Sequence, residues 1–205
     1  MEQQEHWDRV YGRRASEELG WYEPTASTLQ LVLNHSKRGD AIVDVGAGDS
    51  RLADDLLCQG YDDLTLVDIS ADALARSRQR LETAGAGDRI RWIHADITSW
   101  IPDRRFDLWH DRAVFHFLTA DDDRRAYRRT AARALADDGH LIVATFSEAG
   151  PEQCAGLPVV RYSPDRLATE LAPEFELVEH CDLRPAADGV GDRRPYVAVV
   201  MRPAG

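Results

Sequence analysis

Short apolar runs alternate with longer amphipathic segments along most of this chain. The apolar runs are predicted to be buried strands at residues 41–45, 64–68, 90–94, 106–110 and 140–146. The amphipathic segments carry apolar residues at helical spacing and are predicted as helices near residues 50–59, 71–83 and 122–136. This alternation is typical of a parallel sheet with right-handed crossovers. Residues 97–103 leave little room for a full helix, so we expect an irregular crossover there.

Further elements are expected on both sides of this alternating region. Two helices precede it, within residues 2–14 and from Leu29 to the basic and glycine residues at 37–40. A loop rich in Gly and Pro, a capped helix and two closing strands follow it, at residues 147–161, 163–171, 175–181 and 196–201. We expect one domain over residues 1–205, with N-terminal helices in 1–38 and the core in 40–205. The polar stretch that contains Pro185, Gly189 and Gly191 is our candidate for local disorder.

Composition narrows the possible partners. A formal net charge of −11 would repel the phosphate backbone of a nucleic acid. No apolar run approaches the roughly 18 residues of a membrane span, and the acidic, polar N-terminus does not resemble a targeting signal. Cys58, Cys154 and Cys181 are odd in number and lack metal-ligand spacing, so we expect no metal and a reducing, cytoplasmic location.

A glycine turn follows the first predicted strand. The stretch Asp44-Val-Gly-Ala-Gly48 has the form of a turn between a buried strand and a helix, where doubly wound folds bind nucleotide-like ligands. The third glycine of the dinucleotide fingerprint is absent, because Arg51 stands in its place. Asp49 at the helix start would repel phosphate but could receive an ammonium group or lie at the helix dipole. These residues favour an adenosine that carries an amino-acid group over a diphosphate, as in S-adenosylmethionine.

Acidic residues stand at the ends of other predicted strands. Asp68 lies twenty residues beyond Gly48, where a carboxylate can accept hydrogen bonds from both hydroxyls of a ribose; the alternative is a helix N-cap. Asp96 follows the third strand and could accept a hydrogen bond from an adenine amino group, although a solvated loop acid is an equal alternative.

With these residues, the chain resembles the class I (seven-strand, Rossmann-like) S-adenosylmethionine-dependent methyltransferase family from Ala41 to about Phe146. The resemblance implies a three-layer, doubly wound α/β fold with strand order 3-2-1-4-5-7-6 and the last strand to be added antiparallel. It implies S-adenosylmethionine as cofactor and S-adenosylhomocysteine as product. The cofactor-binding residues that it implies are Trp7, Tyr11, Trp21, Asp44, Gly46, Ala47, Gly48, Ser50, Asp68, Ile69, Asp96, Ile97 and His110.

The N-terminal aromatics Trp7, Tyr11 and Trp21 are similar to the front segment of a subgroup of this family. That subgroup includes bacterial small-molecule methyltransferases and eukaryotic protein lysine methyltransferases. In it, the N-terminal helices fold over the cofactor as a lid. Packing of an aromatic helix face is the other interpretation of these side chains.

The stretch His110-Asp-Arg-Ala-Val-Phe-His-Phe-Leu118 resembles the motif beside the transferred methyl group in such enzymes. His110 and His116 are candidates for a general base, since histidine exchanges protons near neutral pH. Arg112 is a candidate for binding an anionic acceptor. A buried packing role is the alternative for His116, and Cys154 is either a substrate contact or an unreactive loop thiol.

The function expected from the sequence is in-line methyl transfer to a small-molecule acceptor, in which the enzyme mainly supplies proximity and alignment. A protein lysine methyltransferase is the first alternative. A nicotinamide-dependent oxidoreductase on the same scaffold is the second, disfavoured by Asp49 and by the missing third glycine.

Overall fold

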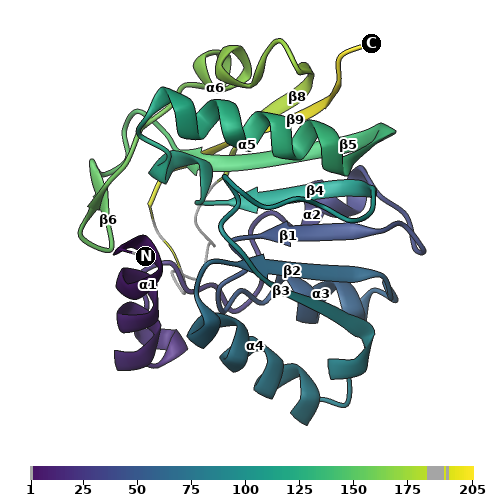
Figure 1. Cartoon of the computed structure of the whole chain (residues 1–205), viewed down its shortest axis with the longest axis vertical. Helices are drawn as coiled ribbons and strands as arrows, with labels where there is room; N and C mark the ends of the chain where they lie inside the picture. Colours follow the sequence, from purple (N-terminus) through teal and green to yellow (C-terminus); the bar gives the residue numbers. More distant parts are fainter. Residues whose placement is uncertain (1, 184–191, 193) are drawn as a thin grey trace.

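The computed structural model describes residues 2–183, 192 and 194–205 of the chain. Its main sheet runs in the order β3-β2-β1-β4-β5-β9-β8 (Figure 1). The strands are β1 (Ile42–Val45), β2 (Leu64–Asp68), β3 (Ile90–His94), β4 (Phe106–Arg112), β5 (Leu135–Phe146), β8 (Phe175–Leu183) and β9 (Tyr196–Pro203). The α-helices are α1 (Glu2–Arg13), α2 (Leu29–Asn34), α3 (Leu52–Cys58), α4 (Ala71–Thr83), α5 (Asp121–Ala134) and α6 (Pro164–Leu171). The short 3-10 turns are η1 (Ser16–Glu18), η2 (Gly87–Arg89) and η3 (Phe115–Phe117).

This topology confirms the predicted strand order. Strands β3, β2, β1, β4 and β5 pair in parallel, and β9 is antiparallel to both of its neighbours, β5 and β8. In the register of β1 and β4, Asp44 lies opposite His110. The carboxyl ends of the parallel strands therefore bring together the polar residues that the sequence places at separate strand ends.

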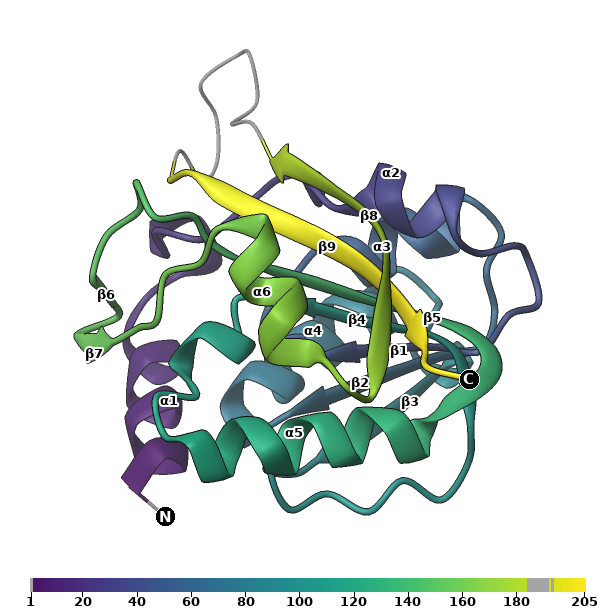
Figure 2. The same cartoon turned by 90° about the horizontal axis from the view of Figure 1, so that it is seen from above.

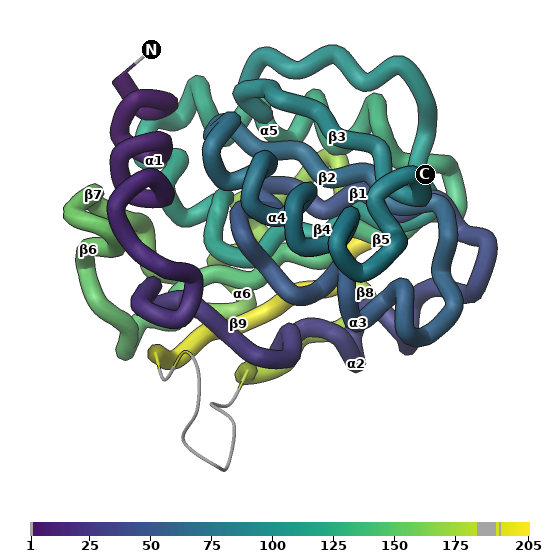
Figure 3. The backbone as a smooth tube through the Cα atoms, turned by 90° about the horizontal axis from the view of Figure 1, so that it is seen from below, coloured from purple at the N-terminus to yellow at the C-terminus, as the bar shows by residue number. Residues whose placement is uncertain are grey.

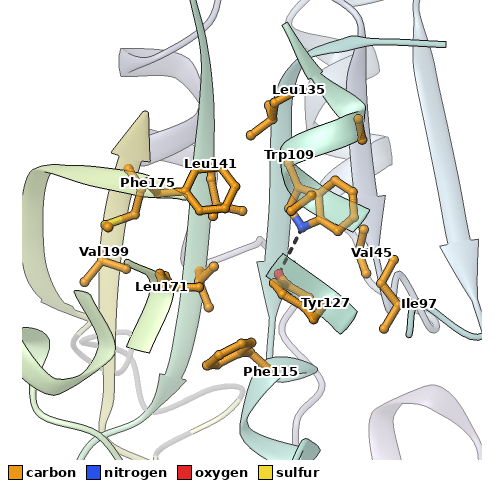
Figure 4. Packing of buried hydrophobic residues seen from close by; sticks show 14 of the residues in the cluster. Val45, Ile97, Trp109, Phe115, Tyr127, Leu135, Leu141, Leu171, Phe175 and Val199 are labelled. Atoms are coloured by element: carbon orange, nitrogen blue, oxygen red, sulfur yellow. Dashed lines mark hydrogen bonds between the residues drawn. The ribbon is translucent and has the colours of Figure 1, made fainter. Parts of the chain in front are cut away.

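The inner strands of the sheet are buried on both faces, whereas the edge strand β8 is mostly exposed. Helices α5 and α6 contribute Tyr127 and Leu171 to one hydrophobic cluster, while α2, α3 and α4 pack on the other face around residues such as Leu56 (Figure 2). In the first cluster the buried Trp109 Nε1 donates to the Tyr127 hydroxyl at 3.0 Å (Figure 4). Near-continuous apolar strands are what a parallel sheet covered on both sides requires.

Local signals explain several element boundaries. Ser70 caps α4 by accepting from the backbone N–H of Ala73, and Ser163 caps α6 with Pro164 in its first turn. As predicted, residues 97–103 form no full helix.

Several boundary predictions differ from the structure by two residues or more. Strand β4 runs two residues beyond His110, and β5 begins at Leu135 rather than at residue 140. Within residues 147–161, predicted as loop, β6 (Gln153–Cys154) and β7 (Leu157–Pro158) form a small antiparallel hairpin. Polar residues at the start of β5 and the shortness of the hairpin leave no alternation for a sequence pattern to detect. Pro185, Gly189 and Gly191, in the polar stretch named as a candidate for local disorder, lie outside the described residues.

Helix α1 and the β6–β7 hairpin both lie at the carboxyl end of the parallel strands (Figures 1 and 3). Trp21, from the segment after α1, packs in one hydrophobic cluster with Cys154 of the hairpin. Two parts of the chain that lie outside the alternating strands and helices thus meet above the strand ends.

Candidate cofactor site and adjoining pocket

The turn after β1 requires glycine, because neighbouring side chains approach its backbone closely. Gly46 and Gly48 have φ of +62° and +53°, a region that favours glycine. A Cβ at Gly46 would overlap the Val114 Cγ2, and a Cβ at Gly48 would overlap the hydroxyl of Tyr11. The turn is therefore packed between the end of β4 and helix α1.

Asp68 ties this turn to the start of α4. Its Oδ2 accepts from the backbone N–H of Gly48 at 2.7 Å, and its Oδ1 accepts from that of Ser70 at 2.8 Å. Burial raises the pKa of this carboxyl to about 6, against the opposing effect of these two hydrogen bonds. The helix cap itself is Ser70, so Asp68 is not the N-cap of the alternative interpretation.

Asp44 and His110 form a buried pair. Asp44 Oδ1 lies 2.7 Å from His110 Nδ1, and His110 Nε2 lies 2.8 Å from the hydroxyl of Thr28. Asp44 Oδ2 is buried without a hydrogen-bond partner among the described residues, although Asp44 lines the cavity at the strand ends. An unpaired buried acceptor is costly, so Asp44 Oδ2 is the oxygen of this pair that is left to accept from a further donor.

Asp96 begins the irregular crossover after β3. Its Oδ1 accepts from the backbone N–H and the hydroxyl of Thr98 at 2.8 and 2.7 Å, which stabilises a turn. Ile97 beside it is 7% exposed and also lines the cavity.

The negative charge of Asp49 is compensated by another residue of the protein. It forms an ion pair with Arg80 of α4 and accepts from the hydroxyl of Ser16 in η1. The carboxylate that could have received a ligand's ammonium group thus joins η1 and α4 to the turn.

The N-terminal aromatics gather in one cluster above the turn. The ring centroids of Trp7, Tyr11 and Trp21 lie 5.9–6.2 Å apart, and Phe117 of η3 lies 5.1 Å from Trp7. Tyr11 is 6% exposed, and burial raises the pKa of its hydroxyl well above the usual value.

One cavity at the carboxyl end of the sheet brings most of the predicted site residues together. The predicted residues that line it are Trp7, Tyr11, Trp21, Asp44, Gly46, Ala47, Ser50, Asp68, Ile69, Asp96, Ile97, His110 and Arg112. Gly48 and His116 are missing from the described residues that line it. Lining residues that the sequence reasoning did not assign include Glu23, Ala26, Ala113, Val114, Phe117 and Leu118. Ala26 and Glu23 lie before a helix of six residues and carry no local sequence signal.

Arg112 lies at the edge of this cavity with its charge already compensated. Its Nη2 donates to Glu23 at 2.8 Å and to Asp192 at 3.0 Å, and its Nη1 donates to the carbonyl of Trp21 at 3.3 Å. The guanidinium also lies over the ring of Tyr196, 4.8 Å from its centroid. Two carboxylates on one guanidinium do not favour an anionic acceptor there.

His116 does not reach the cavity. It is fully buried, with ring centroids 4.5 and 4.6 Å from those of Phe117 and Phe146. Burial, aided by nearby Arg194 and Arg112, lowers its pKa to about 3. An imidazole that stays neutral in a closed apolar site packs the core, so we do not propose His116 as a base.

Cys154 of the β6–β7 hairpin lines the cavity but is 4% exposed. Its Sγ accepts from Arg194 Nη1 at 3.3 Å, yet burial is the larger influence and raises the pKa of the thiol. Cys154 therefore belongs to the cavity wall, and its thiol is not activated as a nucleophile.

The described residues contain no group of three His, Cys, Asp or Glu side chains that could hold a metal ion. In the same part of the chain, no helix has both the length and the apolar content needed to cross a bilayer.

A sequence profile described as "Methyltransferase domain" matches residues 42–139. The chain carries a class I, S-adenosylmethionine-dependent methyltransferase domain. The matched residues run from β1 into β5 and include every strand end that forms the cofactor side of the cavity. This match removes the support for the oxidoreductase alternative.

A bovine (Bos taurus) "eEF1A lysine and N-terminal methyltransferase" is 22% identical to this methyltransferase over 139 residues. The alignment covers 67% of this chain and 20% of the bovine protein, so this chain spans about a fifth of the length of such curated relatives.

Solved structures of similar fold cover nearly the whole chain. One, titled for the conversion of a disulfide bond into a thioacetal group during echinomycin biosynthesis, has a TM-score of 0.75 and 20% identity, covering 98% of this chain and 92% of that one. The N-methyltransferase NodS from Bradyrhizobium japonicum, in complex with S-adenosylhomocysteine, has a TM-score of 0.72 and 17% identity, covering 98% and 100%. At these identities the likeness shows the fold.

The residues of this site fit the cofactor of the family. The donors of S-adenosylmethionine are its amino group, its two ribose hydroxyls and its adenine amine, and the cavity is lined by carboxylates at three strand ends. The unpartnered Asp44 Oδ2 is the clearest sign of a missing donor.

Proposed function

We propose that this protein transfers a methyl group from S-adenosylmethionine to a small acceptor that carries an amine. The proposal rests on one cavity that joins the strand-end carboxylates to an aromatic pocket beneath the N-terminal segment and the β6–β7 hairpin. In this proposal Asp44 and the glycine turn hold the amino-acid end of the cofactor, Asp68 holds the ribose, and Asp96 with Ile97 holds the adenine.

The charges of the cavity support an amine. Besides the ion pairs Asp49–Arg80 and Glu23–Arg112, its lining contains three carboxylates, on Asp44, Asp68 and Asp96, against the guanidinium of Arg51. Such a lining attracts a cationic or neutral acceptor and repels an anionic one.

Aromatic side chains in the same pocket suit the binding of an amine. Trp7, Trp21 and Phe117 can hold an ammonium by cation–π attraction, while the removal of water favours the neutral amine, which attacks the methyl group after its proton has passed to solvent. When bound, the cofactor supplies a methyl group on a sulfonium sulfur, which is already a good leaving group. The protein's own contribution is to align the amine and exclude water.

Methylation of a protein lysine is the second candidate. It is favoured by the bovine relative, whose name states lysine and N-terminal methylation. The cover formed by α1, η1 and the hairpin favours a small acceptor over a protein segment, although a lysine side chain is itself an amine.

Label transfer from methyl-labelled S-adenosylmethionine would test both candidates. A cell extract is divided into protein, small molecules held by a cation exchanger, small molecules held by an anion exchanger, and the unretained remainder. We expect a labelled product, separated by chromatography from the cationic S-adenosylmethionine itself, in the cation-exchanger fraction, and none with the variant Asp68→Ala.

Label in protein would instead support the lysine candidate, and label in the anion-exchanger fraction would contradict the charge argument. If no small-molecule fraction exceeded the Asp68→Ala background, small-molecule methylation would be excluded.

A further inference from the structure

Three buried polar groups form a continuous chain from the N-terminal segment to the cofactor side of the cavity. Thr28 Oγ1 lies 2.8 Å from His110 Nε2, and His110 Nδ1 lies 2.7 Å from Asp44 Oδ1. Thr28, His110 and Asp44 are 0%, 2% and 5% exposed. The groups come from three separate elements, because Thr28 directly precedes α2, His110 is in β4 and Asp44 is in β1.

Hydrogen-bonding chemistry determines the direction of this chain. An ionised Asp44 can only accept, so the proton of His110 is on Nδ1 and points at Asp44. In a neutral imidazole His110 Nε2 is then the acceptor, and the hydroxyl of Thr28 donates to it. Because Thr28 occupies the lone pair of Nε2, His110 is not free to take a proton from a methyl acceptor.

The same contacts determine how Asp44 presents its other oxygen. With Oδ1 held by His110, Oδ2 is the unpartnered acceptor of the pair, on a residue that lines the cavity next to Gly46. This step rests on the proposed function, in which Asp68 and Asp96 accept from the ribose and adenine ends. The donor left for Asp44 is the amino group of the cofactor's amino-acid end.

We propose that His110 is a positioning residue, held by Thr28, that orients Asp44 toward the amino-acid end of the cofactor. His110 acts through Asp44 and is not the base of the reaction. The chain of contacts also joins cofactor binding to the segment that covers the cavity, since Trp21, Glu23 and Thr28 belong to the same stretch between η1 and α2.

Calorimetric titration with two ligands separates this role from a merely structural one. S-adenosylhomocysteine has the amino-acid end, and 5′-methylthioadenosine has the same adenosine and sulfur without it. Thr28→Val keeps the shape of the side chain and removes the hydroxyl, while Thr28→Ser keeps the hydroxyl as the matched control.

We expect Thr28→Val to weaken binding of S-adenosylhomocysteine about fivefold, the effect of one lost hydrogen bond, and to change binding of 5′-methylthioadenosine less than twofold. Thr28→Ser should bind both ligands like the unchanged protein. His110→Asn, which also disturbs Asp44, should show the same selectivity with a larger loss.

Equal weakening of both ligands would indicate a structural role only, and unchanged binding of both would show that the chain of contacts does not orient Asp44. Either result overturns the proposal. Failure of the unchanged protein to bind S-adenosylhomocysteine would instead overturn the proposed function.

Discussion

At the scale of single residues, the site depends on carboxylates that are buried yet face a cavity. Asp68 is 6% exposed and accepts two backbone hydrogen bonds, which hold it at the junction of the glycine turn and α4. A carboxylate has about four acceptor positions, so these contacts leave room for ligand hydroxyls. Its burial makes its ionisation sensitive to mild acid, because the pKa is raised to about 6.

This pKa predicts a pH dependence of cofactor binding. The ionised carboxylate accepts from hydroxyls, so binding favours the form present above pH 6 and weakens as the pH falls through that value. We expect the Kd of S-adenosylhomocysteine to be constant above pH 7 and to rise up to tenfold per pH unit below about 6. Calorimetric titration between pH 5 and 8 would measure it.

Asp68→Asn serves as the control for this titration. Because Asn does not ionise in this range, the variant should bind weakly with a flat profile over the same interval. A flat profile in the unchanged protein would show that Asp68 does not contact the ligand.

At the scale of elements, three consecutive residues at the end of β4, His110, Asp111 and Arg112, make contacts that build the site. His110 and Arg112 point to the same side of the strand and contact the segment between η1 and α2, through Thr28 and through Glu23. Asp111 points to the other side and accepts from the backbone N–H groups of Val114 and Phe115. The segment between η1 and α2 is therefore attached to the core at the end of β4.

The Arg112–Glu23 pair should contribute strongly to this attachment. Their side chains are only 13% and 14% exposed, and removal of one partner leaves the other charge buried. In a double-mutant cycle of Arg112→Met and Glu23→Gln, we expect a coupling of about 1–3 kcal/mol in the free energy of unfolding. Denaturant unfolding of the four proteins would measure it.

The matched control is the exposed pair Arg78–Glu82, whose side chains are 59% and 52% exposed. Its coupling should stay below about 0.5 kcal/mol. A coupling this small for Arg112–Glu23 would contradict a role in holding the segment.

At the scale of the whole molecule, the two hydrophobic clusters bury a sheet whose carboxyl end must also accommodate charge. Asp111 lies at this junction, fully buried, and accepts from the hydroxyl of Tyr127 at 2.7 Å beneath α5. Burial raises the pKa of its carboxyl to about 6. The folded protein therefore favours the neutral, protonated carboxyl of Asp111 over the charged carboxylate.

Global stability should therefore depend on the protonation of Asp111. Its folded pKa lies above the unfolded value of about 3.9, so the stability that it contributes is full below that value and is lost as the pH rises through 6. The unchanged protein should lose stability relative to Asp111→Asn between pH 4 and 7, by up to about 3 kcal/mol. Denaturant unfolding at several pH values would measure the difference, and a constant difference would refute this account.

The amino-acid sequence by itself determined the fold class and which strand-end residues line the cavity. Hydrophobic periodicity is local, so the strands and helices of residues 41–146 could be placed without tertiary information. Parallel strands end at one edge, which is why Asp44, Asp68, Asp96 and His110 could be expected to meet. Their meeting in one cavity needs only the strand order, which the family resemblance supplied.

Tertiary structure alone decided the roles of the charged and histidine residues around that cavity. His110 contacts Thr28 across 82 residues, and Arg112 contacts Glu23 across 89, so no local pattern records either pair. In the sequence, Arg112 has the properties of a free cation and His116 those of a free imidazole. In the folded protein Arg112 pairs with two carboxylates, and His116 is buried among aromatic rings. Protonation and charge in a buried site depend on neighbours brought together by folding, and those neighbours come from distant parts of the chain.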